Sequence, residues 1–416
     1  MSDVNGKTVV MGLQQTFVMF GATVLVPLIT GLDVGVTLFC AGIGTWIFHF
    51  LTGFKVPVFL GSSFAFMPGI LAVAAAKDGG GLPAALGGIV IAGAIYIIVA
   101  LIFTRVSYKV LERILPPQVT GPMIILIGLM LADVAIKNAD GSFAPGAVKE
   151  IGVNGCWLIA LFTFAVGVFV KVYFDKIGKR FISALPVLIA VVSGYLLSAI
   201  VGIVDFSGVS KADWVGLPNF TLPVFEWSAI SIIVPIAFVT LIEHFGDVIA
   251  VGNVVGKDFL KEPGIHRTMT GDGIATSFAA LIGGPANTTY SENTGALALT
   301  GNHNPVIMRI AACLAILLAM IPKFTAIIAA IPAPVIGGIS ILLFGMITSI
   351  GIKNMIDNKV DMNNAKNLII VAAMLVLGIG KAEFAIDAFK LSGLGLAAIV
   401  GILLNLILNF GFVRGK

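Results

Sequence analysis

Long apolar runs separated by short polar gaps occupy almost the whole chain. Ten runs have the length of about 17–25 residues that a helix needs to cross a bilayer: 9–30, 33–51, 82–104, 116–136, 153–171, 183–204, 229–250, 305–321, 333–351 and 391–412. Four others are shorter or are interrupted by polar residues, Gly or Pro: 58–76, 268–283, 286–301 and 366–380. The pattern predicts an all-α polytopic membrane protein with fourteen transmembrane segments.

Composition and charge support this prediction. The 416 residues are 58% hydrophobic and only 11% charged, whereas a soluble domain has about 25% charged residues. So few charges cannot cover a water-facing surface, which excludes a soluble enzyme. The net charge of +4 is not gathered into long basic runs, so we expect no nucleic-acid partner. Cys40, Cys156 and Cys313 form no CxxC motif, and we expect small core residues with neither metal nor cofactor.

The distribution of basic residues predicts the orientation of the segments. The first run, "TVVMGLQQTFVMFGATVLVPLITGL", is too long for a signal-peptide core, so we expect it to remain as the first span. With the N-terminus inside, 18 of the 25 Lys and Arg residues fall on the inner side of the fourteen spans. Both termini are therefore expected in the cytoplasm. Trp214 and Trp227 flank the longest outer loop, 205–228, as interfacial anchors would.

Two stretches of the first half recur in the second half. "LPPQVTGPMIILIGLM" (115–130) aligns with "IPAPVIGGISILLFGM" (331–346), and "PVFLGSSFAF" (57–66) aligns more weakly with "PANTTYSENT" (285–294). Two copies of seven spans have opposite orientations because seven is odd. The prediction is therefore a 7+7 inverted repeat, in which substrate sites lie where corresponding segments are interrupted.

The interrupted segments, spans 3 and 10, are the candidate site. "GGPANTTY" is too rich in Gly, Pro and Asn for a helix, so we expect 286–290 to be extended and a half-helix to start near Ser291 or Glu292. "PVFLGSS" is its expected antiparallel extended partner, with a half-helix beginning near Phe64. Helix N-termini offer unpaired N–H groups to a ligand. The alternative is an ordinary loop in which Glu292 is a solvated acid.

The span 229–250 carries two acids within "LIEHFGDVIAV". Glu243 and Asp247 are four residues apart and share one helical face. Acids inside a span are costly and are functional candidates by default, and an acid withdrawn from water holds a proton more readily. The alternative is a structural pair bonded to polar neighbours. We expect His244 to have a packing role and Asp272 to bond backbone near a helix start, while Gln14 and Gln15 give structural support.

At these residues the chain resembles the nucleobase–ascorbate transporter family, and within it the uracil-permease branch of bacteria. The resemblance rests on "FVMFGATVLVP", "VPVFLGSSFAF", "EHFGD", "PGIHRTM" and "NTTYSENTGALALTG", in family order over nearly the whole chain. The most specific block is an acid or amide followed by N-x-G-x-x-x-x-T, which stands at Glu292, Asn293, Gly295 and Thr300.

The resemblance implies both architecture and activity. A core domain would comprise 1–104 and 229–322, and a gate domain 105–228 and 323–416. The implied activity is proton-coupled uptake of uracil or a related nucleobase by an integral protein of the bacterial cytoplasmic membrane, with a homodimer as the expected assembly. It is not an enzyme in this interpretation.

The resemblance also assigns roles to residues. Glu243 and Glu292 would hold the base, Phe64 would pack against its ring, and Ser291, Tyr290 and Ala22 would line the site. Asp247, Asn293 and Gln14 would support binding or proton coupling. Two departures, Asp247 for a usual His and Gln15 for a usual His, keep a xanthine or purine symporter as the alternative. An anion transporter of the same fold is the further alternative, although the breaks contain no cation.

The chemistry of uracil agrees with these roles. Carboxylates accept hydrogen bonds from its ring N–H groups, helix N-terminal amides donate to its carbonyls, and an aromatic side chain covers its flat face. Glu243, Glu292, the backbone of 291–293 and Phe64 supply this set of groups.

Overall fold

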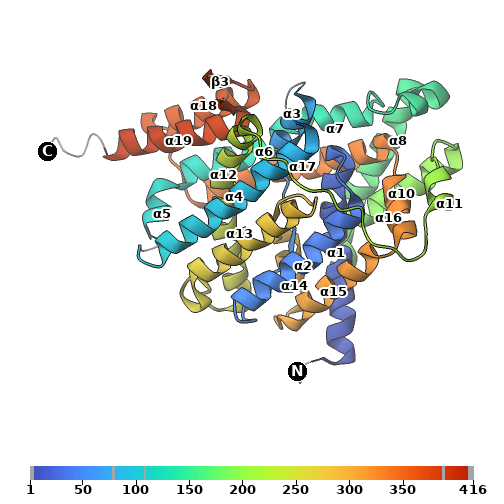
Figure 1. Ribbon diagram of the computed structural model, residues 1–416, viewed down its shortest axis with the longest axis horizontal. Helices are drawn as coiled ribbons and strands as arrows, with labels where there is room; N and C mark the ends of the chain where they lie inside the picture. Colours follow the sequence, from blue (N-terminus) through green and yellow to red (C-terminus); the bar gives the residue numbers. More distant parts are fainter. Residues whose placement is uncertain (1–3, 77–79, 107–108, 387–388, 411–416) are drawn as a thin grey trace.

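The computed structural model describes residues 4–76, 80–106, 109–386 and 389–410 (Figure 1). The predicted location of the chain termini falls on 1–3 and 411–416, which lie outside the described residues, as do the last two positions of the predicted span 391–412. The described residues are mainly helical, as the apolar pattern predicts.

Fourteen apolar elements follow one another in the described residues. The first seven are α1 (Gly6–Thr30), α2 (Val34–Leu51), β1 (Leu60–Ser62) with α3 (Met67–Ala75), α4 (Gly81–Phe103), α6 (Pro117–Met130) with α7 (Ala132–Ala139), α8 (Pro145–Lys176) and α10 (Pro186–Val201). The second seven are α12 (Trp227–Val255), α13 (Ile265–Leu281), β2 (Asn287–Thr289) with α14 (Ser291–Thr300), α15 (Val306–Ala319) with α16 (Pro322–Ala329), α17 (Ala333–Asp357), α18 (Ala365–Ile379) and α19 (Gly393–Phe410). Short helices α5 (Lys109–Ile114), α9 (Arg180–Ser183) and α11 (Ser207–Lys211), the π-helical turn η1 (Leu260–Gly264), and strands β3 (Glu383–Ile386) and β4 (Phe389–Ser392) connect them.

Length and composition agree with a polytopic membrane protein. Among the described residues, seven helices are long and apolar enough to cross a membrane, and an eighth is the bent pair α15–α16. Three more apolar helices, α10, α18 and α19, are shorter. The 17-residue α13 and the two broken segments complete the predicted set of fourteen.

Helix packing reveals the inverted repeat. When each element of the first half is matched in order with one of the second, the packing pairs are also matched. In this matching α1 corresponds to α12, α2 to α13 and α4 to α15. The contact of α1 with α15 therefore corresponds to that of α12 with α4, and the contact of α2 with α15 corresponds to that of α13 with α4. Likewise α6 corresponds to α17, α8 to α18 and α10 to α19. The contact of α8 with α10 corresponds to that of α18 with α19, and the contact of α8 with α17 corresponds to that of α18 with α6. The two halves therefore have the same internal arrangement, related by a pseudo-two-fold axis, as the odd number of spans predicts.

The helices form two packing groups. The core group contains α1, α2, α4, α12, α13 and α15 together with the half-helices α3 and α14. The gate group contains α6, α8, α10, α17, α18 and α19. Figure 1 shows α2, α4 and α13 running side by side, with α18 and α19 at the opposite end of the molecule from α10. Helices α1 and α12 provide the main contacts between the groups.

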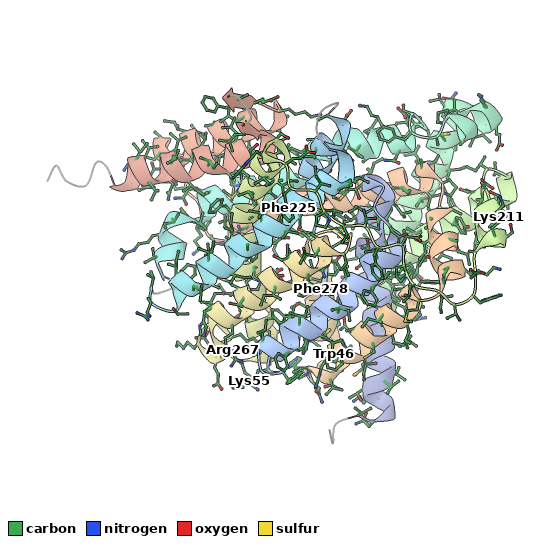
Figure 2. The ribbon with its side chains drawn as sticks, in the orientation of Figure 1. Trp46, Lys55, Lys211, Phe225, Arg267 and Phe278 are labelled. Carbon is green, nitrogen blue, oxygen red and sulfur yellow. The ribbon has the colours of Figure 1, made fainter. Side chains whose placement is uncertain are left out.

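An extended segment, 212–226, lies across one end of the core group. We call it the strap. Its backbone N–H groups at Gly216, Thr221 and Val224 donate to carbonyls of residues 320, 282 and 83, over 2.9–3.2 Å. Lys211 and Phe225, labelled in Figure 2, mark its two ends. Trp214 within the strap and Trp227 directly after it are 72% and 78% exposed, and Lys323 Nζ lies over the Trp214 ring at 4.9 Å from its centroid.

Three local predictions are wrong in detail. The predicted final span begins in a hairpin, because β3 and β4 pair before α19 starts at Gly393. The predicted span 305–321 is correct for α15 and ends at an 86° bend, beyond which α16 follows. The predicted span 153–171 belongs to a longer α8, which includes a non-helical Gly152. Cys313 is exposed rather than a core residue, whereas Cys40 and Cys156 are buried as expected.

Small residues allow helices of the gate group to approach closely. A Cβ atom added to Gly337 of α17 would overlap the backbone of Ala139, and one added to Gly338 would overlap the backbone of Ala160. Gly345 of the same helix has open space at this position. Close approach of this kind is how membrane helices gain packing energy without a hydrophobic driving force.

The two glycines of α17 give a matched pair of variants. We expect Gly337→Ala to lower stability by about 1–3 kcal/mol because the new methyl group forces the helices apart. We expect Gly345→Ala to be neutral or to stabilise by up to about 1 kcal/mol, because alanine is the better helix former. The thermal midpoint of purified protein, followed by tryptophan fluorescence, measures both. Equal midpoints for the two variants would contradict the described packing of α17 on α7.

Candidate functional site

Two short strands meet in the middle of the core group. β1 and β2 pair antiparallel, with Leu60 opposite Thr289, Gly61 opposite Thr288 and Ser62 opposite Asn287. The ladder extends by one hydrogen bond at each end, from Ser63 N to the carbonyl of residue 286 and from Tyr290 N to that of residue 59. Backbone that leaves the helix inside a membrane must find internal partners. Each broken segment therefore satisfies the other, which confirms the predicted extended pair.

A half-helix follows each strand. α14 begins at Ser291, directly after β2, as the sequence predicts. α3 begins at Met67, three residues later than the predicted start near Phe64, because residues 64–66 form a turn and Pro68 occupies the first helical turn. Because the first N–H groups of α14 precede its helical hydrogen bonds, the backbone of 291–293 offers donors at the end of the strand.

Asp247 joins three elements of the core group. Its Oδ2 accepts a hydrogen bond from Thr289 Oγ1 at 2.6 Å, and its Oδ1 accepts one from Ser291 Oγ at 2.5 Å. These bonds tie α12 to the end of β2 and to the first residue of α14. Asp247 therefore fixes where the half-helix begins, and the predicted partner role of this acid has a definite geometry.

Glu243 lies one turn away on the same helix and has a different environment. Its Oε2 is buried and has no hydrogen-bond partner among the described residues. Both Glu243 and Asp247 line a cavity of about 720 Å³. Glu243 thus retains acceptor capacity beside this cavity, whereas both oxygens of Asp247 are already bonded.

The cavity separates the core group from the gate group. Its core-side walls are residues 62–64, 242, 243, 245–247, 249 and 288–292, and its gate-side walls come mainly from α6 and α17. Glu292 is exposed to this space, and Phe64 of the same wall packs edge-on against Phe344 of α17 at 6.2 Å between ring centroids. At one end the cavity reaches Lys353 and Asp357 near the end of α17.

The structure brings most of the predicted site residues to this cavity. The predicted residues that line it are Phe64, Glu243, Asp247, Tyr290, Ser291 and Glu292. Ala22 and Gln14 of α1 and Asn293 of α14 are buried and do not line the cavity. The Tyr290 hydroxyl points into the core group, where it donates to the carbonyl of residue 62 at 3.0 Å.

The polar support between α1 and α14 comes from Gln15. Asn293 Nδ2 donates to Gln15 Oε1 at 2.8 Å and to the Gln15 carbonyl at 3.0 Å. Gln14, which we expected to support the site, has no bond of this kind to α14. Helix geometry explains the difference, since adjacent residues point about 100° apart and only one of the two can face α14.

Sequence reasoning missed several lining residues. On the core side, Thr288 and Thr289 line the cavity just before α14. On the gate side, Thr120 and Asn354 line it, and Asn354 Nδ2 donates to Thr120 Oγ1 at 2.9 Å. The repeat at 115–130 and 331–346 marks α6 and α17 as equivalent elements, so it held a signal for the gate side. Within the residues that the structure describes, no cluster of three or more His, Cys, Asp or Glu side chains could hold a metal ion.

The expected roles of His244 and Asp272 are only partly correct. His244 faces away from the cavity, as expected, but its Nδ1 contacts Asp272 Oδ2 at 2.7 Å and its Nε2 contacts Thr268 Oγ1 at 3.1 Å. Asp272 therefore lies in the middle of α13 and bonds the side chain of His244 on α12. The prediction that Asp272 bonds backbone near a helix start is wrong.

Comparisons with known proteins agree with this arrangement. The family model Xan_ur_permease, described as "Permease family", matches residues 6–385. The uracil permease of Bacillus caldolyticus is 43% identical over 411 residues, covering 97% of this chain and 92% of that protein. The uracil permease of Escherichia coli strain K12 is 39% identical over 401 residues, covering 96% and 91%.

Solved structures of more distant proteins share the fold. The transmembrane domain of the cyanobacterial bicarbonate transporter BicA has a TM-score of 0.66 at 16% identity, covering 97% of this chain and 98% of that chain. The structure of SLC26A9 has a TM-score of 0.69 at 14% identity, covering 97% and 65%. At these identities the likeness concerns the fold alone.

The Asp247 bonds predict a stability effect. Asp247→Ala removes the acceptor of two hydroxyl groups, and leaving buried polar groups unpaired costs about 1–3 kcal/mol. We expect faster backbone hydrogen exchange in residues 287–300 and a lower thermal midpoint. Asp247→Asn is the matched control, because its carbonyl oxygen keeps one acceptor, and its effect should be smaller. Unchanged exchange in Asp247→Ala would show that the two hydroxyl bonds do not hold the half-helix.

Proposed function

Because this chain belongs to the permease family that includes the nucleobase–ascorbate transporters, we propose that it is a proton-coupled uracil symporter. Membership in this family makes it an integral membrane transporter and not an enzyme. The proposal places it in a bacterial cytoplasmic membrane with both termini in the cytoplasm. We also propose a homodimer, which the family resemblance implies.

The observation that carries the proposal is the pair of acids at one cavity. Glu243 has an unpartnered buried oxygen, Glu292 is exposed to the same space, and the amides of 291–293 begin a helix there. Uracil is a flat, neutral ring with N–H donors and carbonyl acceptors on its edge. The acids would accept from the ring N–H groups, and the amides would donate to a carbonyl.

An aromatic side chain completes the proposed site. Phe64 lies on the same wall as the two acids and would cover one face of the ring. The volume of about 720 Å³ is typical of small-molecule sites and leaves room for water beside a single six-membered ring. A free anion is disfavoured by Glu243, Asp247 and Glu292 at the cavity wall, even though Lys353 lies at its far end.

A second cavity supports alternating access. It has a volume of about 760 Å³ and is lined by Pro68 and Ala72 of α3 and by Lys137 and Ile336 among others. None of the acids of the first cavity lines it. We propose that movement of the core residues 1–104 and 229–322, together with the strap, against the other residues of the gate ranges 105–228 and 323–416 connects the site to each cavity in turn.

The proposed orientation assigns a side to the first cavity. Lys353 and Asp357 at its far end belong to the side that the basic residues place in the cytoplasm. The described conformation would then be open to the cytoplasm. The strap would lie on the outer face, where its tryptophans match an interfacial belt.

A xanthine symporter is the alternative that Asp247 favours. Both oxygens of Asp247 are engaged by Thr289 and Ser291, so this acid is less available to a ligand than Glu243 or Glu292. We therefore propose uracil as the preferred base. Displacement of labelled uracil by unlabelled xanthine more strongly than by unlabelled uracil would favour the alternative.

Removing either glutamate tests the binding site. Loss of a hydrogen bond to a charged group costs about 1.5–3 kcal/mol, so Glu243→Ala and Glu292→Ala should each weaken uracil binding roughly 10–150-fold. Glu150→Ala is the matched control, because Glu150 is an exposed acid of α8 outside the cavity. Binding is measured by titration calorimetry on monodisperse protein. Wild-type affinity in either cavity variant would refute the assigned contacts.

Proton coupling requires a separate test. Uracil uptake into proteoliposomes should follow an imposed inward proton gradient and collapse when a protonophore is added. Glu243→Gln resembles the protonated acid, so it should still exchange uracil across the membrane but lose accumulation against a gradient. Uptake that responds to sodium and ignores the proton gradient would rule out the proposed coupling.

A further inference from the structure

A buried ionisable pair lies behind the proposed site. His244 of α12 and Asp272 of α13 are fully buried, and Nδ1 of the first contacts Oδ2 of the second at 2.7 Å. Neither residue lines the cavity, and the proposed binding of a base uses neither of them. His244 nevertheless follows Glu243 directly in the chain, so the pair is attached to the helix that carries the substrate acids.

The bonds of Thr268 determine where one hydrogen of His244 lies. The Thr268 hydroxyl donates to the carbonyl of Ile265 at 3.0 Å, which uses its single hydrogen. Its oxygen also contacts His244 Nε2 at 3.1 Å. When this hydrogen stays on the Ile265 carbonyl, the Thr268 oxygen can only accept, and Nε2 then carries the hydrogen of that bond.

The contact with Asp272 then requires a second proton. If Nε2 carries a hydrogen and Nδ1 does not, a lone pair of Nδ1 faces a lone pair of a carboxylate at 2.7 Å, which is repulsive. The contact is attractive when His244 is an imidazolium beside a carboxylate, or when Asp272 is a carboxylic acid donating to a neutral ring. Both forms have zero net charge and hold one proton more than a neutral histidine beside an ionised aspartate.

The surroundings favour the neutral pair. The ionisable groups around it are Glu243 and Asp247 on α12 and Tyr96 on α4, and Glu292 on α14 lies near both acids of α12. All of these groups except the tyrosine are acids. From α2, the ring of Phe48 packs edge-on against His244 with 6.5 Å between centroids. A net negative charge on the pair would stand among other acids in an apolar setting, which is costly.

We propose that His244 and Asp272 form a proton-holding dyad that is loaded in this conformation and exchanges its proton with Glu243 during transport. The step balances: the dyad passes from zero to −1 as one proton leaves, and the Glu243 carboxylate passes from −1 to zero. This inference rests on the proposed proton-coupled function, which it deepens by identifying a store for the proton outside the substrate contacts.

Three unpartnered buried atoms belong to groups that this transfer would use. Asp272 Oδ1, Glu243 Oε2 and the Tyr96 hydroxyl are all buried without a hydrogen-bond partner of normal geometry among the described residues. Tyr96 is near enough to both acids for their charges to act on it. The proposed transfer would use these groups.

Nitrogen NMR of protein labelled with ¹⁵N-histidine tests the loaded state directly. The chain has four histidines, and a His244→Gln sample assigns the signal of this one. We expect Nε2 to carry a hydrogen. We also expect either a protonated Nδ1 or an infrared carboxylic-acid band that Asp272→Asn removes. A His244 Nε2 without hydrogen would overturn the proposal, because Thr268 would then donate to it. Neither readout needs a substrate.

Transport assays test the use of the proton. Asp272→Asn keeps the size of the side chain and can still donate to Nδ1, but it cannot exchange a proton. We expect uracil exchange within about threefold of wild type and an accumulation ratio at least about tenfold lower. Thr270→Val is the matched control, since the Thr270 hydroxyl bonds only within α13, and it should leave both unchanged. Equal losses of exchange and accumulation in Asp272→Asn would indicate a merely structural pair and overturn the proposal.

A second variant covers failure of Asp272→Asn to fold. Thr268→Val removes the acceptor of Nε2–H, so the dyad should give up its extra proton, with a changed His244 signal and reduced accumulation. An unchanged signal and wild-type accumulation would overturn the proposal. If the wild-type protein exchanges no uracil at all, the proposed function fails, while the NMR result still decides whether the dyad is loaded.

Discussion

The need to satisfy every backbone polar group inside a bilayer determines how this protein can contain a polar site. A helix satisfies its own backbone but presents few free donors, whereas an unwound segment presents donors at a high cost in lipid. Here β1 and β2 resolve this conflict by pairing with each other at the centre of the core group. The site exists because each half of the chain supplies the partner that the other half lacks.

The same constraint explains how the acids are distributed. Asp247 is fully engaged with Thr289 and Ser291, and Asp272 is engaged with His244. Glu243 retains an unpartnered oxygen beside the cavity. Asp247 and Asp272 hold structure in place through these bonds, whereas the spare oxygen of Glu243 is available to a ligand in the cavity. The burial of several acids in one region is therefore compatible with a stable fold, because Asp247 and Asp272 have internal partners.

The sequence predicted those features that local patterns encode. Apolar run lengths predicted the spans, and Gly, Pro and Asn in 283–290 predicted the strand that precedes α14. The choice of Gln15 over Gln14 and the pairing of Asp272 with His244 depend on how helices rotate against each other, which a single sequence does not reveal. The β3–β4 hairpin was missed because its apolar residues run directly into those of α19, so no polar gap marked its presence.

The strap has a mechanical consequence. It belongs by sequence to the connection between α10 of the gate group and α12 of the core group, yet hydrogen bonds attach it to the ends of α4, α13 and α15. Because it is hydrogen-bonded to the core group at several points along its length, the strap moves with the core group. Within this connection, relative displacement of the two groups is then absorbed by the few residues between α10 and α11, which act as a short flexible joint, and not by the long loop that contains them.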